Sequence, residues 1–157
     1  MTENTEKEPV SGPDFRINGL YIKDLSFENP GAPLIFLQPN IKPKISVGVD
    51  VFINNIKESA FDVSLKVSAK AVTEEGRGLF IAEVVYGGLF VLNPSISRDL
   101  WDKVLFVDCA QCIFPYVRRT ITDLTTEGGF APLLLEPIDL EAIYMAKQAK
   151  DKKAANG

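Results

Sequence analysis

The chain has 157 residues, 46% of them hydrophobic and 24% charged, which is a globular composition long enough for one cored domain and too short for two. Its net charge of -4 argues against nucleic acid as a partner, because Lys and Arg supply most of the affinity for phosphates. The N-terminus is polar and acidic, and no apolar run approaches about 20 residues, so we expect neither a secretory signal nor a membrane span and place the protein in the cytosol.

The first ordered segment is predicted at residues 15–28, after a flexible tail at residues 1–14. Its second half alternates at period two, which predicts a strand with Asp24 and Glu28 on one face. The same alternation predicts that the other face carries Tyr21, Lys23, Leu25 and Phe27. Residues 30–43 contain prolines at positions 30, 33, 39 and 43, which predict a crossing loop with an unusually apolar run at Leu34–Leu37.

Three further strands are predicted at residues 44–53, 61–71 and 79–86, each with clean alternation and separated by turns at 54–59 and 73–78. In the last of these, Ile81 and Glu83 face away from Ala82. Short turns between four strands favour an antiparallel sheet with one packed and one wet face.

A long helix is predicted from about Asp99 to Glu127, because the hydrophobic period changes to 3.6, with Phe114, Val117 and Ile121 on one face. Gly128-Gly129 should end it, and Pro115 predicts a kink or a break.

The chain should then run extended to residue 137, and Asp139 should cap a short helix. Residues 147–157 are expected to fray as a flexible tail. The predicted fold class is α+β: a four-stranded antiparallel sheet backed by a long C-terminal helix and a second short helix.

Cys109 and Cys112 form a C-x-x-C pair, which could be a redox dithiol or half of a zinc site. With no other Cys and no His, a tetrahedral zinc site could close only between subunits, so we interpret the pair as packing and expect no cofactor or metal. The absence of His removes the commonest general base, and Gly76-Arg77-Gly78 lacks the spacing of a phosphate loop. The sequence therefore favours a binding protein over an enzyme.

Apolar residues are more numerous than one core needs in three segments: Leu34–Leu37, Phe114–Tyr116 and Gly129–Leu133. A lone chain is also expected to leave the apolar face behind the fourth strand uncovered. Such a surplus predicts either a subunit interface or a groove that binds apolar segments of other chains.

From about Phe15 to Met145 the chain resembles the SecB family of bacterial protein-export chaperones. The stretches that carry this resemblance are Tyr21–Glu28 with Pro30, Glu83-Val84 with Gly87-Gly88, Phe114–Arg118, and Gly128–Leu133 with Pro137-Ile138. The resemblance implies an ATP-independent holding chaperone, active as a homotetramer arranged as a dimer of dimers, with the chaperone domain at residues 15–146.

Two sites also follow from the resemblance. One docks the export motor ATPase SecA through Asp24, Glu28, Ile81 and Glu83. The other is a groove for unfolded preproteins, for which the candidates are Phe36, Phe114 and Tyr116. The alternatives are a structural or regulatory oligomer without client binding, and a C-x-x-C thiol oxidoreductase.

Overall fold

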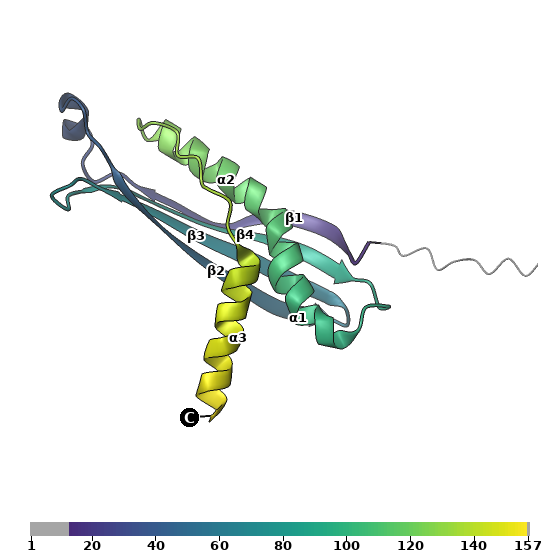
Figure 1. Cartoon of the computed structure of the whole chain (residues 1–157). Helices are drawn as coiled ribbons and strands as arrows, with labels where there is room; N and C mark the ends of the chain where they lie inside the picture. The colour runs from purple at the N-terminus through teal and green to yellow at the C-terminus, as the bar shows by residue number, and fades with distance from the viewer. Residues whose placement is uncertain (1–12, 157) are drawn as a thin grey trace, which may run out of the picture.

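The computed structural model describes residues 13–156, so residues 1–12 of the predicted N-terminal tail lie outside the described residues. Figure 1 shows two layers, a long sheet and a helix that runs obliquely across one of its faces, with a C-terminal helix projecting away from both. The predicted α+β architecture is confirmed. We call the sheet face under the long helix the inner face and the opposite one the outer face.

The sheet is antiparallel throughout, with its strands in the order β1-β4-β3-β2. The strands are β1 (Phe15–Glu28), β2 (Lys44–Lys57), β3 (Ala60–Val72) and β4 (Gly78–Leu92). Because β1 and β2 form opposite edges, the segment between them must cross the end of the sheet, as predicted. This crossing loop contains a short 3-10 helix, η1 (Leu34–Leu37), whose Ile35 is buried.

Strand β1 carries a bulge at Lys23 that inverts the side-chain alternation. The register passes from Ile22 opposite Tyr86 to Asp24 opposite Val85, which leaves Lys23 as an extra residue. Directly opposite residues share a face, so Tyr21 and Asp24 both lie on the outer face, and the prediction that they face opposite ways is wrong. Asp24 and Glu28 do share a face, because the bulge precedes both.

Helical residues run without interruption from Arg98 to Glu127. The run consists of η2 (Arg98–Leu100), α1 (Trp101–Lys103), a π-helical segment η3 (Val104–Cys109) and α2 (Ala110–Glu127). It does not break at Pro115; both Pro115 and Gln111, whose carbonyl would lose its partner, are exposed, so water can satisfy that carbonyl.

The core lies between α2 and the inner face of β3 and β4. Ile113, Val117 and Ile121 of α2 are fully buried, as are Ala82 and Val84 of β4. The expectation that a lone chain leaves the face behind β4 uncovered is therefore wrong, since the chain's own helix covers it. Apolar side chains remain exposed at the two edges of the inner face instead: Ile17, Ile22 and Leu25 on β1, and Ile45 and Val47 on β2.

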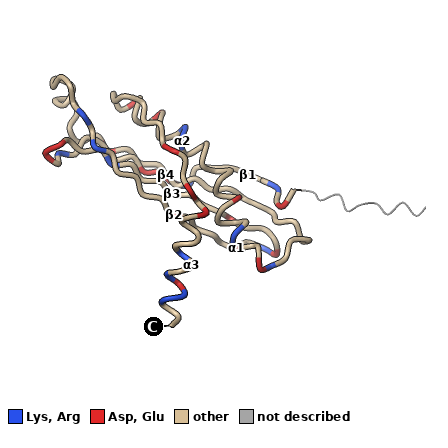
Figure 2. The backbone as a smooth tube through the Cα atoms, viewed as in Figure 1, with Lys and Arg blue, Asp and Glu red and all other residues tan. Residues whose placement is uncertain are grey.

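The C-terminal helix α3 (Leu140–Asn156) starts at the predicted cap, where the Ala142 amide donates to Asp139 Oδ1 at 3.0 Å. Tyr144 holds its first turns against Phe106, with ring centroids 5.4 Å apart. The helix is longer than the short one predicted and continues through residues expected to fray. Figure 2 shows blue segments in its projecting half, which carries Lys147, Lys150, Lys152 and Lys153.

Candidate functional site: two binding surfaces

The outer face brings together the four residues predicted to dock a partner protein. Glu28 lies opposite Ile81, and Ser26 lies opposite Glu83, so strand pairing places Glu28, Ile81 and Glu83 side by side on β1 and β4. Asp24 follows one step along the same face, opposite Val85. We call Asp24, Glu28, Ile81 and Glu83 the acidic face. An apolar side chain flanked by carboxylates can steer and then hold a basic partner surface.

Glu83 is already paired within the chain. Lys66 Nζ of β3 lies 3.0 Å from Glu83 Oε1, and Ser68 Oγ donates to the same oxygen at 3.3 Å. Hydrogen bonding and charge attraction in this pair lower the pKa of Glu83 and raise the pKa of Lys66. Both shifts agree with an ion pair between Lys66 and Glu83 on the outer face.

A second polar contact lies at the bulge in β1. Tyr21 Oη donates to Asp62 of β3, and Lys23 forms an ion pair with the same carboxylate, whose side chain is only 12% exposed. Both side chains cross β4 above Gly87, where an added Cβ would lie 2.6 Å from the Tyr21 ring. The missing side chain at Gly87 therefore lets β1 reach over β4 to β3 and helps to fix the strand that carries Asp24.

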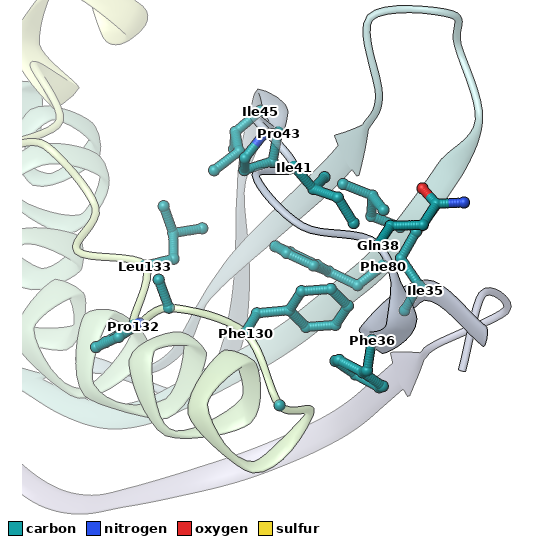
Figure 3. Close-up of a pocket in the computed structure, with 13 residues that line it drawn as sticks. Ile35, Phe36, Gln38, Ile41, Pro43, Ile45, Phe80, Phe130, Pro132 and Leu133 are labelled. Atoms are coloured by element: carbon teal, nitrogen blue, oxygen red, sulfur yellow. The ribbon is translucent and has the colours of Figure 1, made fainter. Parts of the chain in front are cut away.

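An apolar groove opens between the crossing loop and the segment after α2 (Figure 3). Its first cavity, about 350 Å³, is lined mainly by Ile35, Phe36, Ile41, Ile45, Phe80, Phe130 and Leu133. The Phe130 ring lies 5.0 Å from the Phe80 ring and 5.6 Å from the Phe36 ring, measured between centroids. These three rings come from the loop, the sheet and the segment after α2, so the cavity exists only where all three meet.

The groove continues along the edge strand β2 into a second cavity of about 320 Å³. Ile45 and Leu133 line both cavities, and Val47 and Ile138 extend the second one. We call the two cavities together the groove. Because Ile45 and Val47 lie on an exposed edge strand, apolar surface of the sheet remains open to solvent there.

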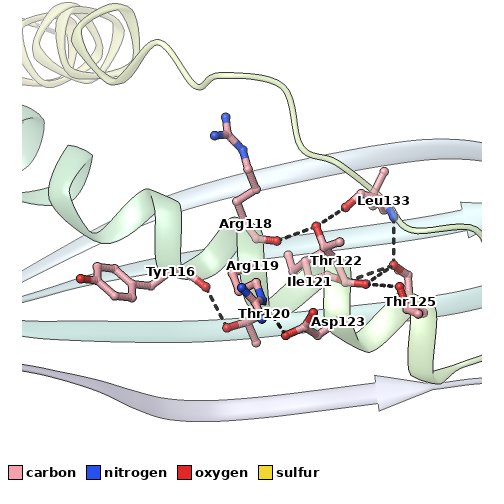
Figure 4. A network of polar contacts seen from close by, with 10 residues as sticks. Tyr116, Arg118, Arg119, Thr120, Ile121, Thr122, Asp123, Thr125 and Leu133 are labelled. Atoms are coloured by element: carbon pink, nitrogen blue, oxygen red, sulfur yellow. Dashed lines mark hydrogen bonds and ion pairs between the residues drawn. The ribbon is translucent and has the colours of Figure 1, made fainter.

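Polar side chains of α2 hold the far wall of the groove in place (Figure 4). Thr122 Oγ1 lies 2.7 Å from the Leu133 carbonyl, and the Leu133 amide donates to Thr125 Oγ1 at 3.0 Å. Arg118 Nε donates to the Leu135 carbonyl at 3.0 Å. These bonds satisfy the backbone of an extended segment outside the sheet, so it stays attached to α2 while its apolar side chains turn to the groove.

The three residues predicted to bind clients do not all line the groove. Phe36 lines the groove and is half exposed, but Phe114 is 2% exposed, and its ring packs under the Arg118 guanidinium 4.6 Å away. Tyr116 is exposed but stacks on Tyr86, outside the residues that line either cavity. The groove therefore gathers Phe36 but neither Phe114 nor Tyr116.

The predicted client site left out most residues of the groove, among them Ile45, Phe80, Phe130 and Leu133. Two of them, Phe130 and Leu133, fall in the apolar segment after the helix, and that surplus was the available signal. Ile45 and Phe80 look like ordinary core residues of an alternating strand, and only the order of strands in the sheet shows that Ile45 lies at an open edge.

The two cysteines lie in the helical run, Cys109 fully buried and Cys112 partly so. Burial raises the pKa of both thiols, which disfavours the reactive thiolate. Among residues 13–156, no three His, Cys, Asp or Glu side chains gather as metal ligands, and none of the helices is both long and apolar enough to cross a bilayer. The burial of the two thiols agrees with the interpretation of the cysteines as packing.

Comparison with known proteins finds relatives that match nearly the whole chain. Residues 8–151 match the family model described as preprotein translocase subunit SecB. The protein-export protein SecB of Granulibacter bethesdensis is 39% identical over 100% of this chain and 96% of its own length. That of Hyphomonas neptunium is 41% identical over 96% and 89%. Among solved structures, a SecB-like chaperone of Mycobacterium tuberculosis in complex with an antitoxin peptide superposes with a TM-score of 0.68 at 16% identity, over 80% of this chain and 91% of that one.

Proposed function

The chain belongs to the SecB family of preprotein translocase subunits, and on this premise we propose that it is an ATP-independent holding chaperone. It binds unfolded preproteins in the cytosol, keeps them competent for export and delivers them to the motor ATPase SecA. It carries out no chemical reaction of its own. The open apolar groove is the observation that carries this proposal, because such a surface has to be covered by something.

The size of the groove suits a chaperone that holds several side chains of one client. Burying one large apolar side chain contributes roughly 1.5–3 kcal/mol. Micromolar affinity needs about 8 kcal/mol, in addition to the cost of ordering an unfolded chain. Two connected cavities can take several such side chains, and apolar contact does not depend on their order in the client sequence.

The working form is a homotetramer built as a dimer of dimers, with a mass of about 70 kDa from chains of 17.3 kDa. The unpaired edge strand β1 supports this assembly, because its inner side exposes Ile17, Ile22 and Leu25. Several grooves on one particle raise the local concentration of binding sites for a long client.

Delivery to SecA occurs at the acidic face. Its carboxylates point away from the helix layer and from the groove, so the motor and a client can bind at the same time. Charge complementarity with a basic partner would speed association and select the partner.

A charge placed in the groove tests client binding. Ile45→Asp puts a carboxylate on the exposed apolar edge strand, and Ser46→Asp adds the same charge one residue later on the outer face. We expect Ile45→Asp to lower the affinity for a chemically unfolded preprotein by about tenfold or more, because a buried unpaired charge is costly. Ser46→Asp should bind as the parent does.

The readouts are titration of an unfolded preprotein and suppression of its aggregation, with native mass as a check on assembly. Equal affinities for the parent and Ile45→Asp would mean that the groove is not the client site. A parent that forms tetramers but never suppresses aggregation would favour a purely structural oligomer. Activity that depends on a thiol reductant would favour the oxidoreductase.

A further inference from the structure

Lys66 occupies the centre of the outer face. It lies directly opposite Val85 of β4 and Asp50 of β2, and Val85 in turn lies opposite Asp24 of β1. One row across the sheet therefore reads Asp24, Val85, Lys66, Asp50. The ammonium group leans out of this row to the neighbouring carboxylate Glu83, 3.0 Å away.

The surroundings of this lysine are acidic on three sides. Glu83 bonds it directly, and the negative charges of Asp50 and Asp24 add to the attraction that raises the pKa of Lys66. Among residues 13–156, Lys66 is the only cation that forms an ion pair with Glu83.

The pair is built so that it can open. Both side chains are 36% exposed, and exposed ion pairs are weak because water and salt screen them. A lysine ammonium is a single charge on a flexible stem, whereas arginine would grip the carboxylate with two parallel hydrogen bonds. A basic partner can therefore displace it, and Ser68 Oγ, 3.3 Å from Glu83 Oε1, gives that carboxylate a second hydrogen-bond donor.

We propose that Lys66 is an internal competitor for the acidic face: it occupies Glu83 in the free chain and must release it before a basic partner can dock. The proposal rests on the proposed function, in which that partner is SecA. The competition weakens docking of every basic surface. A partner therefore binds only if further contacts, for example with Ile81 and Asp24, offset the free energy lost when the Lys66–Glu83 pair opens. The lysine then sets specificity at a cost in affinity.

The test is to remove the competing charge and look for tighter binding. Lys66→Met keeps the apolar stem and deletes the ammonium. Affinity for purified SecA at low salt should rise about two- to fivefold, the range expected for releasing an exposed ion pair. A gain of affinity cannot come from a damaged fold, and affinity for an unfolded preprotein should not change.

Two further variants separate competition from net charge. Lys70→Met deletes the same charge on the same outer face, opposite Ile81, and among the described residues Lys70 forms no ion pair. It should raise the affinity for SecA less than Lys66→Met does. In a Glu83→Gln background the gain in SecA affinity from Lys66→Met should shrink to that from Lys70→Met. The reason is that the variant has no carboxylate at position 83 for Lys66 to occupy.

Weaker docking of Lys66→Met would overturn the proposal, since it would mean that Lys66 positions Glu83 for the partner. Equal gains from Lys66→Met and Lys70→Met would also overturn it. If Asp24→Lys leaves SecA affinity unchanged, or the parent does not bind SecA, the docking face itself is wrong and the proposal falls with it. If Asp24→Lys weakens SecA binding but Lys66→Met leaves the affinity unchanged, only the proposed competition is rejected.

Discussion

The acidic face and the groove lie on opposite sides of one sheet and present opposite kinds of side chain. Carboxylates on the acidic face are fixed by strand register, so they favour a partner whose charges match their positions. The groove is made of rings and aliphatic chains, whose attraction has no direction. If both surfaces bind as proposed, one small fold combines a selective surface for a single partner with an unselective surface for many clients.

Charge reversal on the acidic face should produce the largest difference between the two surfaces. Asp24→Lys is expected to weaken SecA binding by about 100-fold or more, because like charges facing each other at an interface cost several kcal/mol. Client affinity should stay at the parent value, since Asp24 is exposed on the face away from the groove.

Calorimetric titration of the variant with SecA and with an unfolded preprotein measures both affinities. Ser46→Lys, which adds a positive charge to the outer face at the far edge strand, is the control and should have a much smaller effect. If both affinities of Asp24→Lys fall together, the acidic face supports folding or assembly and the two surfaces are not separate.

A substitution at the groove should have a smaller effect, and it should lower the affinity for clients and not the affinity for SecA. Gly129 follows α2 with φ of +88°, and a Cβ there would lie 2.8 Å from the Phe36 ring. Gly129→Ala should lower the free energy of unfolding by about 1–3 kcal/mol and reduce client affinity by displacing that ring. Docking to SecA should be unaffected.

Urea unfolding measures the stability of this variant, and client titration measures the groove. Gly48→Ala is the control, because an added Cβ at this position on β2 meets nothing within 4 Å. A Gly129→Ala protein as stable as the parent, with normal client affinity, would show that the end of α2 does not shape the groove.

The smallest expected effect concerns the tyrosine that fixes β1 on the outer face. Burial and the hydrogen bond to Asp62 raise the pKa of Tyr21 from 10.0 to about 12. The folded state holds this proton more tightly than the unfolded state, so the stabilisation is complete below pH 10 and is lost as pH rises from 10 to 12. Tyr21→Phe should flatten the fall in stability over that range.

Absorbance of tyrosinate during a pH titration should show a component near 12 that is missing in Tyr21→Phe. If the component that Tyr21→Phe removes lies near 10 and not near 12, the contact with Asp62 does not form in solution.

The sequence predicted the sheet and the long helix well, because period-two and period-3.6 patterns report burial directly. The same pattern also placed Phe114 with Val117 and Ile121 on the inward face of the helix, and the structure confirms its burial. The prediction of Phe114 as a client residue conflicted with the helical pattern, which places Phe114 in the core. The bulge at Lys23 could not be predicted, because a single extra residue leaves the alternation on each side of it intact.

Residue pairs that are distant in sequence decide the rest of the site. No periodicity shows that the Phe36 ring meets the Phe130 ring, or that Lys66 reaches Glu83, since both contacts depend on the crossing loop and on strand order. The acidic residues could be assigned to a face from sequence, but their lysine competitor could be found only from the register.

The crossing loop has a consequence for the protein during its own synthesis. Because the loop leads from β1 to the opposite edge of the sheet, β2 and β3 are synthesised before β4, the strand that pairs with β1. The loop also carries Phe36, whose ring lies against that of Phe130, after the end of α2. A nascent chain that has not yet released β4 from the ribosome therefore has no acidic face, and one that lacks the segment after α2 has no groove. On the proposed function, the chain therefore acquires both binding surfaces only after β4 and the segment after α2 have been translated.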